Sequence, residues 1–180
     1  MRRGPGGPVK RLPYLALSAA VVLVDQATKL AVDRFLELHE TRTLVEGLLA
    51  LTYVRNRGAA FGILSEASLP HQTLLFSFVS LCALAGIVAY ALWLPVHERL
   101  SQVALGLVIG GAIGNLLDRA RNGYVVDFVD VFWKSHHWPA FNVADSAITT
   151  GVALVVLDML LSPAGGRGEA VGAVPSRRTE

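Results

Sequence analysis

The amino-acid sequence predicts an all-α integral membrane protein with four transmembrane helices and a small β-rich extracytoplasmic connector between the first two helices. Hydrophobic residues make up 53% of the 180 residues, charged residues make up 17%, and the mean hydropathy is +0.49. A soluble domain is usually less apolar and carries more charge. Four apolar runs cover approximately residues 12–32, 69–94, 101–117 and 142–161. The length of each run is close to the roughly 17–25 residues with which a helix spans a bilayer. Because lipid offers no partners for backbone polar groups, these runs are expected to be helical.

The four runs predict one membrane domain, residues 12–161, with a short tail at each end and no separate soluble domain. Residues 1–11 contain four cations and no acidic residue, which places the N-terminus in the cytoplasm. Four spans return the C-terminus to the same side. Residues 162–180 are rich in Gly, Pro and Arg and are predicted to be a disordered cytoplasmic tail. Lysine and arginine are otherwise almost evenly divided, eight inside and seven outside, so the predicted orientation depends on the N-terminal cluster.

The first apolar run has two readings, an anchored helix or a cleaved signal peptide, because a basic segment precedes it. The apolar pattern continues past Asp25 to Val32 without a clear small-residue cleavage site, which favours the anchored helix. Asp25 and Lys29 are four residues apart with the acid first, the better order for a helical ion pair. Lys29 could therefore clamp Asp25, or it could extend to the membrane interface with its ammonium group in water.

The connector of residues 33–68 is predicted to form a hairpin or small sheet lying on the membrane. Its middle, TLVEGLLALTYVRN, is rich in strand-forming residues. It leads into NRGAAFG (56–62), where Gly58 and Gly62 permit tight backbone geometry. This loop could hold an extended peptide backbone, or it could be an ordinary polar turn. Its side-chain donors are Asn56 and Arg57, and its apolar surface is Phe61.

The second and third runs are predicted to serve mainly in packing. Cys82 is the only cysteine and lies in the middle of the second run, so we predict a packing residue and neither a disulfide nor a thiol catalyst. The third run has glycines at four-residue spacing, a pattern that lets another helix approach closely. These glycines are Gly106, Gly110 and Gly114.

The third run ends in GNLLDR (114–119), where Asn115 and Arg119 are helical neighbours and Asp118 continues the glycine face. Two interpretations remain open. The polar groups could form a local Asp–Arg pair at a helix end, or they could line a site at the extracytoplasmic end of the bundle.

Carboxylates flank the start of the fourth run. Asp127 and Asp130 lie in VVDFVDV (125–131), and they would point to opposite faces of a strand, so only one can face a given site. Periodicity does not choose between them. Asn142 and Asp145 have the spacing of a helix-capping box, which offers a purely structural account of Asp145. A carboxylate beside a membrane-length apolar run otherwise faces a wet cavity, finds a partner or takes part in chemistry.

Several chemistries have no support in the sequence. We find no HExxH or other metal-ligand spacing, no G-x-S-x-G motif and no phosphate-binding loop. The basic residues are spread along the chain, so no nucleic-acid-binding stripe is predicted. Two functional classes other than an enzyme are compatible with parts of the sequence. One is a proton- or cation-coupled transporter with a relay through Asp25, Asp145 and Asp158, although no inverted halves are detectable. The other is a scaffold built on the glycine face, which leaves the polar motifs unexplained.

Five short motifs occur in register between residues 12 and 161: DQATK (25–29), NRGAAFG (56–62), GGAIGNLLDR (110–119), VVDF (125–128) and FNVADSA (141–147). Together they resemble signal peptidase II, the bacterial lipoprotein signal peptidase. The resemblance implies a monomeric aspartyl endopeptidase of the bacterial cytoplasmic membrane that needs no metal or cofactor. Its substrates would be diacylglyceryl-modified prolipoproteins, cleaved on the N-terminal side of the lipidated cysteine at the outer face of the membrane.

The same resemblance implies a role for each polar position. Asp127 and Asp145 would be the catalytic pair, and Asp130 an outward-facing neighbour. Two close carboxylates cannot both ionise easily, so the pair would hold one proton and serve as acid and base towards a water molecule. The positions implied to surround the site are Asn56, Asn115, Arg119 and Asn142, and those implied to support the structure are Asp25, Lys29 and Asp118.

Overall fold

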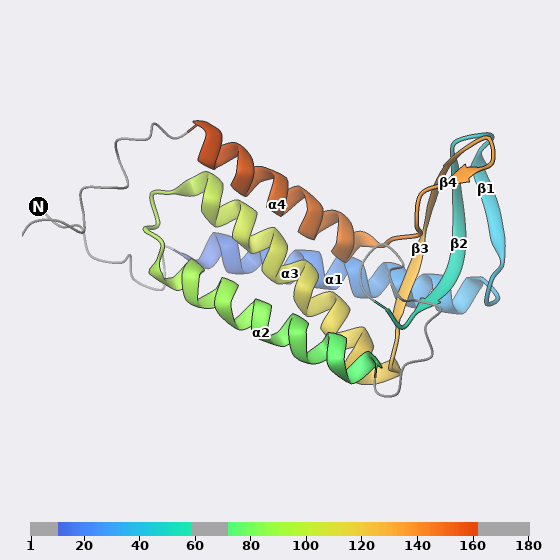
Figure 1. The fold of residues 1–180 in the computed structure, drawn as a ribbon, viewed down its shortest axis with the longest axis horizontal. Coiled ribbons are helices and arrows are strands. Elements are labelled where there is room, and N and C mark those ends of the chain that lie inside the picture. The colour runs from blue at the N-terminus through green and yellow to red at the C-terminus, as the bar shows by residue number, and fades with distance from the viewer. Residues whose placement is uncertain (1–10, 59–71, 162–180) are drawn as a thin grey trace, which may run out of the picture.

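The computed structural model describes residues 11–58 and 72–161, and four long helices dominate it (Figure 1). They are α1 (Leu12–Phe35), α2 (Gln72–Trp93), α3 (Arg99–Asn122) and α4 (Val143–Leu161). All four are long and apolar enough to cross a membrane, as the sequence predicts. The helices α1 and α3 continue beyond the predicted ends at 32 and 117, and their added polar residues bond to neighbouring elements: Asp33 accepts from Tyr53 of β2, and Arg121 donates to Gln26 of α1. The predicted start of the second helix at residue 69 lies outside the described residues.

Helix α3 packs against α1 and α4 through its glycine face. A Cβ atom added at Gly106 would lie 3.2 Å from the Tyr14 carbonyl oxygen, and one added at Gly110 would lie 2.8 Å from the Ser18 carbonyl oxygen, both on α1. Side chains at these positions would therefore force the two helices apart. The prediction of a close helix–helix contact along the glycines is confirmed.

Helix α2 contacts the bundle mainly through α3, and no residue in its most apolar window is buried. Large side chains on it are exposed, Leu74 and Phe78 each to 66%. Cys82 is exposed as well. It therefore lies on the surface available to lipid and not at a packed helix contact as predicted, because an apolar run does not distinguish the residues that face lipid from those that face protein.

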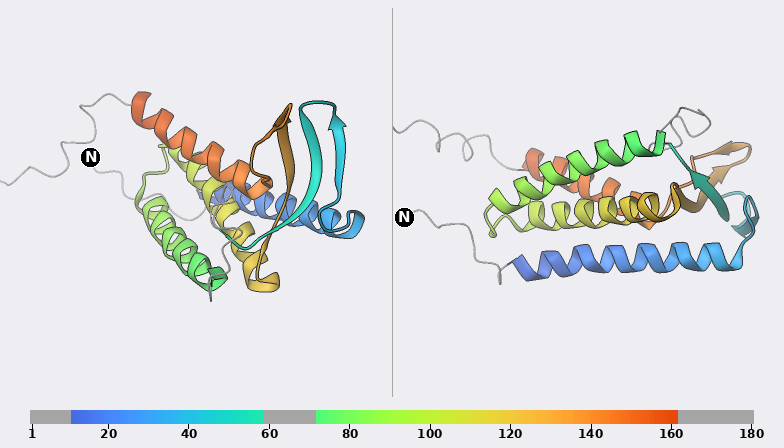
Figure 2. Two further views of the ribbon diagram at one scale, coloured as in Figure 1. Left: turned by 45° about the vertical axis from the view of Figure 1, so that its right-hand side comes forward. Right: turned by 90° about the horizontal axis from the view of Figure 1, so that it is seen from below.

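A four-stranded antiparallel sheet lies across one end of the bundle (Figures 1 and 2). Its strands are β1 (Thr41–Val45), β2 (Leu49–Asn56), β3 (Val125–Trp133) and β4 (His136–His137), in that order across the sheet. The sequence placed a sheet only between the first two helices. The structure corrects this, because β3 and β4 come from the connector between α3 and α4 and β3 pairs with β2.

The sheet is fixed to the bundle by an apolar cluster at the end of α1. Val32 of α1 packs with Tyr53 of β2 and with Val126 and Phe128 of β3, and all four side chains are at most 6% exposed. The base of the sheet is therefore held beside α1, while the turns at its other end extend away from this helix (Figure 1).

Candidate active site

Asp127 and Asp145 are brought to the junction of the sheet with α3 and α4. Asp127 lies on β3 and is 2% exposed, and Asp145 lies in the first turn of α4. Asp127 pairs with Val54 across the sheet, whereas Asp130 pairs with Ala50. Strand alternation therefore puts the two carboxylates on opposite faces, as predicted, and Asp127 is the one that faces α4.

Asn142 joins the two carboxylates of the pair. Its Nδ2 donates to Asp127 Oδ1 at 2.7 Å, while its Oδ1 accepts the Asp145 backbone N–H at 2.9 Å. In return, the Asn142 backbone N–H donates to Asp145 Oδ2 at 3.3 Å. The predicted capping box is thus present. Capping is not the only role of this contact, because Asn142 also binds the Asp127 carboxylate. Asn142 is completely buried.

Asn115 binds the other oxygen of Asp145, with its Nδ2 donating to Asp145 Oδ1 at 2.8 Å. Its Oδ1 accepts from Lys29 Nζ at 2.9 Å and from Asn142 Nδ2 at 3.3 Å. The ammonium group requires the amide oxygen of Asn115 to face it, and the amide nitrogen must then face Asp145. Lys29 therefore sets the orientation in which Asn115 meets the site.

Lys29 is 3% exposed and forms ion pairs at 2.9 Å with both Asp25 and Asp118. The interpretation that its ammonium reaches water at the membrane interface was wrong, since the carboxylates and Asn115 compensate its burial. The alternative, a clamp to Asp25, is what the structure shows, and it extends to α3 through Asp118.

Each of these supporting carboxylates also holds the backbone next to one member of the pair. Asp25 Oδ1 accepts the backbone N–H of Ala144 at 2.9 Å, immediately before Asp145. Asp118 Oδ2 accepts the backbone N–H of Val126 at 3.1 Å, immediately before Asp127. The buried cluster thus fixes the two elements that carry the pair. It does not form the local Asp118–Arg119 pair considered as an alternative.

Gln26 also belongs to this cluster, although its role was not predicted from the sequence. Its Nε2 donates to Asp118 Oδ1 at 2.9 Å and to Asp25 Oδ2 at 3.2 Å. Its position next to Asp25 inside an apolar run could have indicated a buried polar contact. A glutamine that faces lipid would show the same sequence pattern, so the two cases cannot be distinguished from sequence.

Asn56 binds Asp127 from the strand β2, with its Nδ2 donating to Asp127 Oδ2 at 2.9 Å. Its Oδ1 accepts the Gly58 backbone N–H at 2.8 Å, and Arg119 donates to the Gly58 carbonyl oxygen at 3.1 Å. Arg119 Nε is buried and has no hydrogen-bond partner among the residues that the structure describes. The rest of the predicted loop, including Phe61 and Gly62, lies outside the described residues.

The pKa of the Asp127 carboxyl is raised to about 7, first by burial and then by the nearby Asp145 carboxylate, while hydrogen bonds from Asn56 and Asn142 oppose the shift. The arrangement can therefore keep one proton near neutral pH and use it as an acid, with the partner carboxylate as a base. No group of three or more His, Cys, Asp or Glu side chains suited to a metal ion occurs within residues 11–58 and 72–161.

Two other predicted positions lie apart from the pair. Asp130 accepts a hydrogen bond from His137 Nδ1 or shares an ion pair with it at 2.9 Å. His137 lies with His136 on β4. Asp158 contacts Ser101 Oγ and lies about 20 Å along the helix axis from Asp145, so the carboxylates suggested for a transport relay do not form one cluster.

Comparison with known proteins gives a consistent family. A family model described as signal peptidase (SPase) II matches residues 17–161. A protein of Geobacter metallireducens described as a lipoprotein signal peptidase is 51% identical over 147 residues, which cover 82% of this chain and 90% of the relative. One of Geobacter sulfurreducens with the same description is 47% identical over 152 residues, covering 82% and 94%. A solved bacterial membrane enzyme superposes with a TM-score of 0.75 at 30% identity, covering 89% of this chain and 94% of its own.

Proposed function

The chain belongs to the signal peptidase II family, and we propose that it is an aspartyl endopeptidase that removes signal peptides from diacylglyceryl-modified prolipoproteins. Cleavage would fall on the N-terminal side of the lipidated cysteine. The observation that carries this proposal is the pair Asp127 and Asp145, held together by Asn142 within hydrogen-bond distance of both.

The reaction uses the one proton that the coupled pair retains. The ionised carboxylate takes a proton from a bound water, which attacks the carbonyl carbon of the scissile amide, while the protonated carboxyl donates to the carbonyl oxygen. When the tetrahedral intermediate collapses, the C–N bond breaks, the pair passes a proton to the leaving nitrogen, and it takes one proton back from a hydroxyl group of the intermediate as the C=O bond forms. No metal or organic cofactor enters these steps.

The surrounding amides and Arg119 position the pair and the substrate. Asn56, Asn115 and Asn142 fix the carboxylates by the hydrogen bonds described above, which leaves the reacting oxygens in a defined geometry. Arg119 donates to the carbonyl oxygen of Gly58, and Asn56, which binds Asp127, accepts the Gly58 backbone N–H. A segment held in this way can bind the extended backbone of the substrate around the scissile bond.

The membrane arrangement follows from the basic N-terminal segment. We place the tails, residues 1–11 and 162–180, in the cytoplasm and the sheet with its site at the extracytoplasmic face, with residues 12–161 acting as a monomeric peptidase domain. A lipid-anchored peptide would then meet water at the site while its acyl chains stay in the bilayer.

The proposal is tested by cleavage of a purified lipidated prolipoprotein. Asp127→Asn and Asp145→Asn each remove the acid–base pair and are expected to lower kcat by at least about 100-fold. Asp130→Asn is the matched control, because Asp130 lies on the same strand but on the opposite face. Full activity in either pair variant would contradict the aspartyl mechanism. A prolipoprotein without diacylglycerol, measured in parallel, tests the lipid requirement and is expected to be cleaved poorly.

A further inference from the structure

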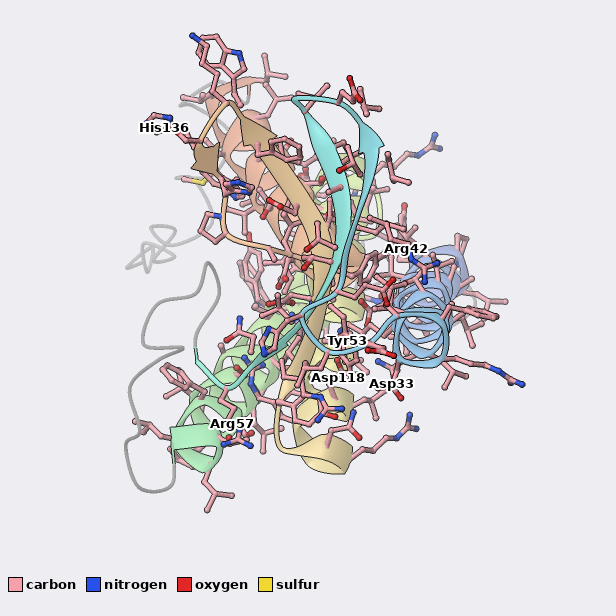
Figure 3. All side chains as sticks on the ribbon, turned by 90° about the vertical axis from the view of Figure 1, so that its right-hand side faces the viewer. Asp33, Arg42, Tyr53, Arg57, Asp118 and His136 are labelled. Atoms are coloured by element: carbon pink, nitrogen blue, oxygen red, sulfur yellow. The ribbon has the colours of Figure 1, made fainter. Side chains whose placement is uncertain are left out.

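A cavity of about 480 Å³ opens between α1 and α3, and neither Asp127 nor Asp145 lines it. Its lining includes Lys29 and Asp118, so the cavity reaches the buried cluster that supports the site. Figure 3 shows Asp33, Tyr53 and Asp118 in one region beside α1, with His136 far away at the other end of the sheet.

The lining combines an exposed apolar wall on α1 with a polar rim near the sheet, while Gln26 and Lys29 line the cavity between the apolar residues of that helix. Leu23, Ala27 and Leu30 of α1 form an apolar wall, and Leu23 and Leu30 are 70% and 69% exposed. The next lining residue on this helix is Asp33, about 15 Å from Leu23 at 1.5 Å per residue. Arg121, at the end of α3, shares the polar rim near the sheet. A phospholipid has the same distribution, with a charged headgroup at the interface and an acyl chain below it.

The rim carries one cation and one anion. A guanidinium group has five N–H donors, and Arg121 donates one hydrogen bond to Gln26 Oε1 at 3.1 Å, so it can also bind phosphate. The Asp33 side chain is 52% exposed and interacts with Tyr53 and, at 4.0 Å, with Arg55. Deeper in the cavity, Lys29 forms ion pairs with the lining residue Asp118 and with Asp25, which does not line the cavity. The lining charges sum to zero, which fits a zwitterion better than an anionic lipid.

We propose that this cavity binds a phospholipid with a primary ammonium headgroup, of the phosphatidylethanolamine class. Its phosphate lies at Arg121 and Asn122, its ammonium group at Asp33, and one acyl chain along Leu23, Ala27 and Leu30. The ammonium group is favoured over a quaternary choline because it can donate charge-assisted hydrogen bonds to the Asp33 carboxylate. This site is independent of the proposed peptidase chemistry.

The test uses native mass spectrometry of the delipidated full-length protein, titrated in detergent with palmitoyl-oleoyl phosphatidylethanolamine, phosphatidylcholine or phosphatidylglycerol. We expect the first lipid to bind about fivefold more tightly than the other two, the scale of one partly exposed charge pair. Asp33→Asn is expected to abolish this preference without weakening phosphatidylcholine binding. Arg121→Gln is expected to weaken the binding of all three lipids, because each of them carries the phosphate.

Two further variants distinguish lipid binding in this cavity from nonspecific lipid binding elsewhere on the protein. Ala27→Phe fills the apolar wall and is expected to reduce binding of all three lipids at this site. Arg34→Gln removes an exposed cation from the residue next to Asp33 that does not line the cavity, and it is expected to change nothing. Equal binding of all three lipids, a preference for phosphatidylglycerol, or equal effects of Arg34→Gln and Arg121→Gln would each overturn the proposal. Thermal unfolding of every variant checks that the fold is intact.

Discussion

Lys29 is the side chain on which the orientation of the carboxylate pair depends most. It contacts Asp25, Asp118 and Asn115 at 2.9 Å each. Lys29→Met keeps the length of the side chain but leaves two buried carboxylates without their cation, which should cost about 3–5 kcal/mol of stability. We expect a clearly lower unfolding temperature and a lower kcat, because Asn115 loses the ammonium that orients its amide. Lys134→Met, at a turn of the sheet, is the control. A Lys29→Met protein as stable as the wild type would contradict this account.

The raised pKa of Asp127 predicts the alkaline limb of the pH–rate profile. The protonated form of the pair is lost as the pH rises through about 7, so kcat/KM should fall about tenfold per pH unit above that value. The Asn56 hydrogen bond favours the charged form of Asp127 and thus lowers its pKa. Asn56→Ala should therefore raise the pKa of Asp127 and move the fall in kcat/KM to higher pH. If the fall occurs at the same or a lower pH, the titration does not belong to Asp127.

The roles of single residues could be predicted only in part from their spacing. The spacing of Asn142 and Asp145 correctly indicated a capping box, yet it could not show that Asn142 also binds Asp127, 15 residues away. Strand alternation separated Asp127 from Asp130 but could not choose between them, since both belong to the same local pattern. The burial of Lys29 depends on Asp118 of another helix, and no property of the first apolar run reveals it.

The glycine face of α3 sets how closely α1 can approach. Gly110→Ala would place a Cβ atom 2.8 Å from the Ser18 carbonyl oxygen of α1, and backbone atoms cannot yield as a flexible side chain can. We expect a loss of about 1–3 kcal/mol from overpacking, measured by thermal unfolding in detergent. Gly86→Ala on α2 is the matched control, because a Cβ atom there would meet nothing within 4 Å. Helix propensity alone would stabilise both variants, so stabilisation of Gly110→Ala would contradict the close contact.

The helices were easier to predict than the sheet, for a physical reason. A membrane helix satisfies its own backbone hydrogen bonds, so a run of apolar residues is sufficient to locate it. A strand requires a partner, and β2 finds it in β3, as in the pairing of Val54 with Asp127. This pairing joins two connectors separated by α2 and α3. Local composition therefore identified the first hairpin but missed that the sheet is completed by the segment carrying Asp127.

The position of the whole molecule relative to the bilayer can be tested with the tryptophans at the free end of the sheet. Trp133 and Trp138 are 72% and 58% exposed near the β3–β4 turn, and Lys134 Nζ lies 5.3 Å from the Trp133 ring centroid. Trp133 alternates onto the same sheet face as Asp127, which looks towards the helices. If the sheet lies on the bilayer, these rings occupy the headgroup region, where tryptophan is favoured.

In a Trp93→Phe variant, lipids brominated near the headgroup should quench the remaining tryptophan fluorescence, and acrylamide in water should quench it only partly. The chain has three tryptophans, so a Trp133→Phe, Trp138→Phe double variant reports Trp93 of α2 alone. Trp93 is 76% exposed on a membrane-length helix and serves as the positive control for quenching by lipid. Strong quenching by acrylamide with none by brominated lipid would mean that the sheet stands away from the bilayer. In that case the free end of the sheet would not touch the lipid surface, and water would reach the carboxylate pair at the base of the sheet.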